Sequence, residues 1–191
     1  MSQDGAIIGV SDHGGWAVLV TVALDGAVLD SRRVVLVDED LPSLPHHHDA
    51  LKLPLDEGVA LVERVRLSAQ RHARLCFEAA EASIPAKIRG VALRRLQPLP
   101  ATVAERLQNY RAQNVADWVM YRNALADAAR LSGWAVHWFD PKTVLDAARA
   151  ALRLGSLDAR FAEAKTRFGP PWTQDHRLAM AAAIAAADTG G

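Results

Sequence analysis

The chain has one cysteine, Cys76, among its 191 residues, so it cannot form an internal disulfide. A lone thiol is typical of a protein from a reducing compartment. The chain also has no excess of charge of either sign, with 22 Lys and Arg against 22 Asp and Glu. This balance excludes the globally basic surface that often indicates a nucleic-acid partner, although a local basic patch remains compatible with it.

Long apolar runs are missing too. The amino-terminal residues MSQDG are acidic, and the apolar stretches are short and interrupted, which argues against a signal peptide or a membrane span. We therefore expect a cytoplasmic protein with no membrane partner. Internal repeats are absent, and half of the residues are hydrophobic, so residues 1–191 are expected to form a single domain with a substantial core.

Three consecutive strands are predicted in the stretch AIIGVSDHGGWAVLVTVALDGAVLDSRRVVLV, residues 6–37. It is rich in the β-branched residues that favour a pleated surface, and the strands are expected over 6–12, 16–24 and 27–37. Asp25-Gly26 favours a type I′ hairpin between the last two, because that turn needs positive φ at both central residues.

Helices and two further strands alternate after this stretch. Residues 38–54 are predicted as a loop, since they combine an acidic trio with prolines. Thr102 and Glu105 have the spacing of a capping box. Caps, prolines and glycines then predict helices over 56–82, 102–132 with a break near 113–114, 141–154, 157–168 and 173–187, and strands over 88–96 and 134–139.

This order of elements predicts an α/β fold with a five-stranded mixed sheet and helices on both faces. Short turns make the first three strands antiparallel neighbours, and helical crossovers make the later strands parallel. The expected strand order is 3-2-1-4-5, with only strand 2 antiparallel, which is the arrangement of the ribonuclease H-like fold. The residues expected in its core include Ile8, Val10, Val20, Val91 and Leu93.

The second half of the chain carries motifs that resemble a known family. Residues 121–144 run from YRNALADAARL through Gly133 to the strand-end sequence WFDP and Val144. This passage resembles the helix, strand and "aromatic-x-Pro-x-x-Val" segment of RuvC-type Holliday-junction resolvases. Residues 171–186, PWTQDHRLAMAAAIAA, are similar to the last helix of that family, and the opening IIGV, residues 7–10, to its first strand.

The resemblance implies a catalytic site formed by Asp12, Asp175 and His176. The first-strand aspartate of the family falls on Ser11 without a gap and on Asp12 after a shift of one residue, which in a strand turns the side chain to the opposite face. In the last helix the two acids of the family fall on Thr173 and His176, with Asp175 between them.

The fourth strand departs from the family, because it reads LRRLQ over residues 93–97 where a glutamate would stand. Two-metal cleavage of a phosphodiester needs several carboxylates to hold Mg²⁺ ions about 4 Å apart. The resemblance therefore implies a degenerate member of the family, with Mg²⁺ on Asp12 and Asp175 and with His176 assisting proton transfer. Asp140 is a further carboxylate, although in front of Pro141 it is most simply a helix N-cap.

The same residues also have purely structural interpretations. Asp12 and His13 tolerate the unusual backbone of a turn beside Gly14-Gly15, and Asp175 complements the macrodipole at the start of its helix. The histidines of residues 46–48 are interpreted as a solvated loop, since three consecutive residues cannot all point at one metal ion. Core packing is expected for His72, Trp118, Trp134, Trp138 and Trp172.

A nucleic-acid partner, DNA or RNA, requires positive charge near the end of the first strand. The nearest candidates are Arg94 and Arg95 on the fourth strand, of which alternation places one on each face, and Arg177 in the last helix.

Two functions follow as hypotheses. The first is a weak or degenerate Mg²⁺-dependent nuclease acting on nucleic acid, and the second is a binding or adaptor module that keeps the fold without the metal site. A third hypothesis comes from the Asp-x-Gly-Gly turn, which resembles the phosphate-binding hairpin of actin-like ATPases. Those enzymes close two such domains around a nucleotide, so this function would require a homodimer.

Overall fold

A five-stranded mixed sheet forms the centre of the molecule. The computed structural model describes residues 5–188. The strands β1 (Ala6–Asp12), β2 (Trp16–Ala23), β3 (Val28–Val35), β4 (Ile88–Arg94) and β5 (Ala135–Phe139) lie in the order β3-β2-β1-β4-β5. β2 is antiparallel to both of its neighbours, β1 and β3, and the strands β1, β4 and β5 are parallel to one another. The predicted order and directions are confirmed.

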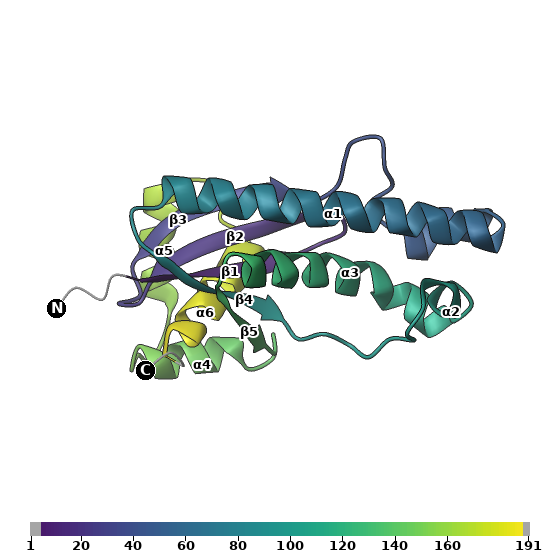
Figure 1. Ribbon diagram of the computed structural model, residues 1–191. Helices are drawn as coiled ribbons and strands as arrows, with labels where there is room; N and C mark the ends of the chain where they lie inside the picture. The colour runs from purple at the N-terminus through teal and green to yellow at the C-terminus, as the bar shows by residue number, and fades with distance from the viewer. Residues whose placement is uncertain (1–4, 189–191) are drawn as a thin grey trace.

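Helices cover both faces of this sheet (Figure 1). The helices α1 (Leu55–Ser83) and α3 (Tyr110–Leu131) run side by side along one face, and the short α2 (Val103–Leu107) precedes α3. The other face is covered by α6 (Gln174–Asp188), which packs on β1 and β2, with α4 (Val144–Ala151) against α6 and α5 (Asp158–Phe168) beside them.

Alternation along β1 divides the hydrophobic interior into two cores. Ile8 and Val10 point into the core beneath α1 and α3, while Ile7 points into the core beneath α6. The five residues predicted to be buried are confirmed: Ile8, Val10, Val20, Val91 and Leu93 are all fully buried.

The contact between β1 and α6 is unusually close because both surfaces consist of small residues. A Cβ atom on Gly9 would lie 1.8 Å from the carbonyl oxygen of Ala179, so only glycine fits there. Ala179 and Ala183 are themselves completely buried. This contact brings the first turn of α6 to the carboxyl end of β1.

Several predicted boundaries are corrected by the structure. The hairpin after β2 is closed by a bond from the Gly26 N–H to the Ala23 carbonyl, and Gly26 alone takes positive φ there, so the turn is not type I′. The helical break lies at 108–109 rather than 113–114, because Asn109 caps α3 by accepting from the Ala112 N–H. The capping box of Thr102 and Glu105 is confirmed.

The segment after β3 is more ordered than the predicted loop. It contains two short helical turns, η1 (Pro45–Asp49) and η2 (Ala50–Lys52), which pack against α1 and α3. His46 within η1 is completely buried, so the interpretation of residues 46–48 as a solvated loop is wrong for this residue. His48 is exposed.

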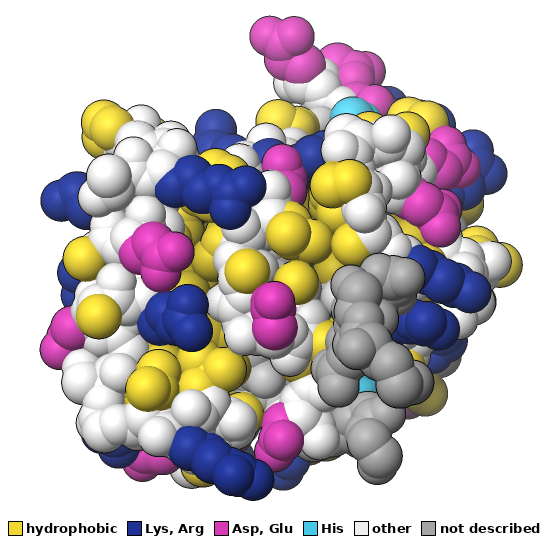
Figure 2. Space-filling model, turned by 90° about the vertical axis from the view of Figure 1, so that its left-hand side faces the viewer, with side chains coloured by type: hydrophobic (Ala, Val, Ile, Leu, Met, Phe, Trp, Pro, Cys, Tyr) yellow, Lys and Arg dark blue, Asp and Glu magenta, His cyan; other side chains and the backbone are white. Residues whose placement is uncertain are grey.

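The end of the molecule where β1 begins shows how the neutral net charge is distributed. Figure 2 views this end and shows positive and negative side chains interspersed around apolar ones, with no large patch of one sign. Among residues 5–188 no helix is both long and apolar enough to cross a membrane.

Candidate functional site

A polar cluster centred on Asp175 lies where α6 begins. The hydroxyl of Ser11, at the end of β1, donates to Asp175 Oδ1 at 2.7 Å, and His13 Nε2 lies 2.9 Å from the same oxygen. Ser11 points toward α6 because it shares the face of Ile7 and Gly9 along β1. Ser11, and not Asp12, is therefore the residue of this strand end that faces α6.

The carboxylate of Asp175 is held in its charged form. Partial burial raises its pKa, but hydrogen bonds from Ser11 and His13, with the charges of His13 and His176, lower it by more. The net result is a pKa below the ordinary value, so Asp175 is ionised at neutral pH and attracts a donor or a cation.

His176 lies beside this cluster, and its ring is turned back toward its own helix terminus. Its Nδ1 accepts from the Thr173 N–H at 3.1 Å and lies 3.0 Å from the Thr173 hydroxyl. The neutral imidazole therefore carries its proton on Nε2. Burial lowers the pKa of His176, and nearby Asp175 opposes that shift only in part.

Asp12 does not join Asp175 and His176, because its side chain points to the opposite face of the sheet. It is buried under α3, where the Arg122 Nε lies 2.8 Å from Asp12 Oδ2. Its other oxygen, Oδ1, is buried without a hydrogen-bond partner among the described residues. Asp12 follows Ser11 by one residue, and in a strand this places its carboxylate on the other face of the sheet.

The donors at the end of β1 do not fit a pair of Mg²⁺ ions. On the α6 side they comprise the carboxylate of Asp175, the Ser11 hydroxyl and the His13 imidazole, whereas each Mg²⁺ prefers oxygen ligands in octahedral geometry. Within residues 5–188, no three His, Cys, Asp or Glu side chains are grouped to hold a metal ion. Asp140 is exposed, and its Oδ1 accepts from the Lys142 N–H in a turn ahead of α4, so it is not the predicted N-cap.

The three arginines expected to contact nucleic acid lie in different surroundings. Arg94 ends β4 on the face of Ala92, which packs beneath α6, and its Nε is buried without a partner among the described residues. Arg95 follows on the opposite face by alternation. Arg177 is exposed, with its guanidinium 5.6 Å from the ring centre of Phe161 in α5.

A further arginine, Arg33, lies on β3 close to the Asp175 cluster. The exposed Arg33 places its guanidinium carbon 4.3 Å from the ring centre of Trp16, and the His13 ring stacks on the same indole at 4.0 Å. Cation–π and stacking contacts of this kind fix the direction of the guanidinium. His13 thereby links the Asp175 cluster to Arg33.

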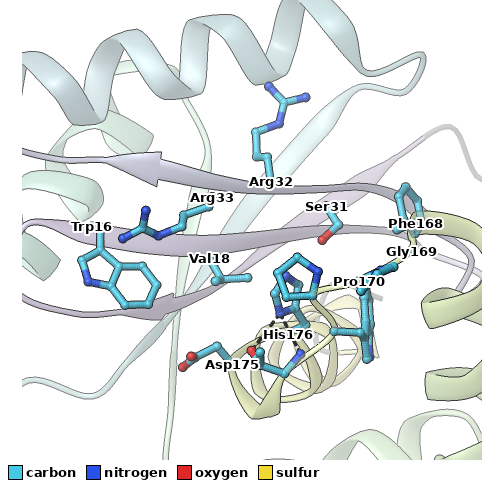
Figure 3. Close-up of a pocket in the computed structure, with 13 residues that line it drawn as sticks. Trp16, Val18, Ser31, Arg32, Arg33, Phe168, Gly169, Pro170, Asp175 and His176 are labelled. Carbon is cyan, nitrogen blue, oxygen red and sulfur yellow. Dashed lines mark hydrogen bonds between the residues drawn. The ribbon is translucent and has the colours of Figure 1, made fainter.

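A pocket of about 360 Å³ opens beside this stack, between the β2–β3 surface and the start of α6. Figure 3 shows Arg33, Val18 and Ser31 on the strand side, and Asp175 and His176 opposite on α6. Phe168 and Pro170 also line the pocket. Arg32 points away toward α1, where it donates to the Ser83 hydroxyl at 2.7 Å.

Comparison with solved structures finds RuvC of Thermus thermophilus. Its complex with a Holliday junction substrate is 15% identical over 96% of this chain and 92% of that chain, with a TM-score of 0.49. A second Thermus thermophilus RuvC structure is 14% identical over 96% and 93% of the two chains, with a TM-score of 0.46. No family model matches the chain, and no curated protein matches it.

The strand order decides the fold class. The fold is ribonuclease H-like.

Within this ribonuclease H-like fold, α3 carries a buried polar cluster that the pattern of residues did not indicate. The Nδ1 of His46 lies 2.7 Å from Asp117 Oδ1, and Asp117 also accepts the backbone N–H groups of His46 and His47. The Tyr121 hydroxyl donates to the Ser43 carbonyl at 2.9 Å. Together these bonds fasten the segment after β3 to α3, which is a structural role.

Sequence reasoning missed Trp16 and Arg33 as site residues of the ribonuclease H-like fold. Both lie in strands that were identified, and the strand registers pair Trp16 with Val35 and Val18 with Arg33. A hairpin register predicted from the Asp25-Gly26 turn would have placed the two side chains near each other. The register gives only their nearness, and that the Arg33 guanidinium lies over the Trp16 ring is known from the tertiary structure.

Proposed function

We propose that this chain is a ribonuclease H-like module that binds nucleic acid and does not cleave it by a two-metal mechanism. The observation that carries the proposal is the disposition of charge at the carboxyl end of β1. Asp175 is engaged by Ser11 and His13, and Asp12 is paired with Arg122 behind the sheet. Asp175 is then the carboxylate left on the α6 face at this end, and one carboxylate is too little negative charge to hold two metal ions.

The positive groups near this end favour binding. Arg94 stands on β4, next to β1, on the face that α6 covers, and the residue is partly exposed, so its guanidinium is a candidate donor for a phosphate oxygen. Arg33 supplies a second guanidinium across the β2–β3 surface. Two local arginines are compatible with the neutral total charge, since phosphate binding depends on the charge that the strand meets.

The test measures binding of labelled branched, duplex and single-stranded DNA, and of single-stranded RNA, by fluorescence anisotropy at low salt. We expect binding that falls steeply as salt rises, because each neutralised phosphate releases counterions. Arg94→Gln should reduce the slope by about one unit, as expected for one lost phosphate contact. Arg95→Gln, at the adjacent position on the opposite face, is the matched control.

Cleavage is assayed on the same substrates with millimolar Mg²⁺ or Mn²⁺. We expect no nicked product above background. Metal-dependent cleavage that is lost in Asp175→Asn would overturn the non-cleaving half of the proposal. Absence of binding to all four substrates would overturn the nucleic-acid half and leave the adaptor hypothesis.

A further inference from the structure

The pocket between the β2–β3 surface and the start of α6 has one apolar wall made of rings. Phe168 and Trp172 lie with ring centres 6.4 Å apart and an interplanar angle of 21°, and Trp172 packs on His176 at 5.1 Å. Pro170 and Pro171 extend this wall. Such a surface favours a flat apolar ligand that displaces water from it.

Polar groups around the pocket can recognise the edge of a ring and an attached anion. Both hydrogen bonds that Asp175 accepts from described residues end on Oδ1, so Oδ2 can accept from a ligand. The Trp172 Nε1–H is buried without an acceptor among the described residues. Arg33, held on the Trp16 ring, supplies positive charge at the rim.

The size of the pocket limits what it can hold. Its volume of about 360 Å³ lies near the lower end of the range for small-ligand sites, about 300–1,000 Å³. A single nucleobase with its sugar fits such a volume, whereas a base-paired helix does not enter it.

We propose that this pocket receives one unpaired base of a single strand of nucleic acid, with the adjoining phosphate on Arg33. The proposal rests on the proposed function and specifies its substrate class. The base packs against the wall of Phe168 and Trp172, and its hydrogen-bonding edge meets Asp175. Stacking contacts tolerate any base, because every base has a π-face.

The experiment compares two labelled single strands of about eight nucleotides, a length within the range for single-strand sites. One is oligothymidylate, and the other is an abasic strand with the same number of phosphates. We expect the abasic strand to bind about tenfold more weakly, because it keeps the phosphates and loses the stacked base.

Neighbouring arginines provide the matched variants. Arg33→Gln removes the guanidinium at the pocket, and Arg32→Gln removes one that points toward α1 on the opposite face. Arg33→Gln should weaken oligothymidylate binding several-fold and Arg32→Gln should not. Trp172→Leu should bring the affinities of the two strands together, and thermal unfolding of each variant verifies that it is folded.

The inference fails if the abasic strand binds as tightly as oligothymidylate, or if Arg33→Gln behaves like Arg32→Gln. If the protein binds duplex or branched DNA but does not bind single strands, the inference is also overturned, while the proposed function stands. A third outcome also overturns the inference. If thymidine monophosphate binds and none of the single strands displaces it, the pocket is a site for a small molecule. Failure of every nucleic acid to bind is the separate result that removes the proposed function.

Discussion

At the scale of single residues, the direction of one side chain decides the chemistry at the end of β1. Ser11 and Asp12 are neighbours in the chain, yet Ser11 meets Asp175 of α6 and Asp12 meets Arg122 of α3. Residues in a strand alternate between faces, so a carboxylate displaced by one position lies on the opposite side of the sheet. Here the Asp12 carboxylate pairs with Arg122 inside the fold.

The Asp12–Arg122 pair is expected to be costly to break from one side. Arg122→Met leaves the completely buried Asp12 carboxylate unpaired, which should lower the free energy of unfolding by about 3–5 kcal/mol. The exposed pair of Arg130 and Asp127 on the same helix provides the control, and Arg130→Met should cost less than about 1 kcal/mol. Urea denaturation measures both.

Removing both charges should restore much of the loss, because no unpaired ion then remains. The double variant Asp12→Asn with Arg122→Met is expected to be more stable than Arg122→Met alone. A double variant as unstable as the single one would contradict the view that an unpaired Asp12 carboxylate causes the loss.

His176 should make the stability depend on pH. Its pKa in the folded state is below the ordinary 6.5, so as pH falls the unfolded chain takes up the proton first. Stability should therefore decrease as pH falls from about 7 to about 5. His176→Asn, which keeps an acceptor for Thr173, should flatten this decrease. The exposed His48, changed to Asn, is the control.

A contribution of the opposite sign would be informative. If His176→Asn steepens the decrease in stability between pH 7 and pH 5, the folded state stabilises the imidazolium, and the neutral tautomer assigned from the Thr173 bond is wrong.

At the scale of elements, the packing of α6 on β1 positions the site. α6 has few large side chains toward the sheet, and the alanines that replace them allow its backbone to approach Gly9 closely. This approach is what brings Asp175 within hydrogen-bonding distance of Ser11. A wider spacing between helix and strand would separate the two groups.

Gly9→Ala should disrupt this contact severely. The new methyl group would overlap the Ala179 carbonyl, and a backbone atom cannot rotate out of the way, so the cost should exceed the usual 1–3 kcal/mol of an overpacked core. Gly155→Ala is the control, because its Cβ meets nothing within 4 Å. Thermal and urea unfolding of the two variants give the comparison.

An unchanged stability of Gly9→Ala would contradict the tight β1–α6 contact. If Gly9→Ala gives no soluble protein while Gly155→Ala gives a normal yield, the result supports the tight contact.

At the scale of the whole molecule, the ribonuclease H-like sheet brings few carboxylates together at the carboxyl end of β1, because Asp12 faces α3 and Asp175 faces Ser11. We expect Mg²⁺ or Mn²⁺ at millimolar concentration to leave the melting temperature unchanged, because a metal stabilises only where it binds the native state. Differential scanning fluorimetry with and without metal provides the measurement. The same titration on Asp175→Asn serves as the control.

A rise of several degrees that disappears in Asp175→Asn but persists in Asp12→Asn would show a metal site on the α6 face. That result would contradict the proposed function at its central point. A rise that persists in both variants would place the metal elsewhere on the molecule.

The overall architecture was predictable because it follows from local signals. β-branched runs, a short hairpin and capped helices between later strands specify element types and directions. The preference for right-handed crossovers then leaves few topologies, and the observed order β3-β2-β1-β4-β5 is the one expected. Boundaries such as Asn109 at the start of α3 were missed by a few residues, since neighbouring polar residues offer competing caps.

The candidate site was predictable only in part. Asp175 and His176 were placed correctly at the start of the last helix, because the break at residues 169–171 precedes the alanine-rich segment. The partners of Asp12 and His46 are Arg122 and Asp117 on α3. Neither pairing has a signal in the local pattern, since each joins residues about 70 or more positions apart.

The sequence by itself thus determined the elements, their order and the sheet topology, because these depend on periodicity, turns and the handedness of connections. Only the tertiary structure decided which face each charged side chain serves, that Trp16 and Arg33 stack, and that a pocket opens beside Asp175. These features depend on strand register and on the distance between α6 and β1. The register follows the hydrophobic pattern and the hairpin geometry, and the distance between α6 and β1 is set by the small residues at their contact.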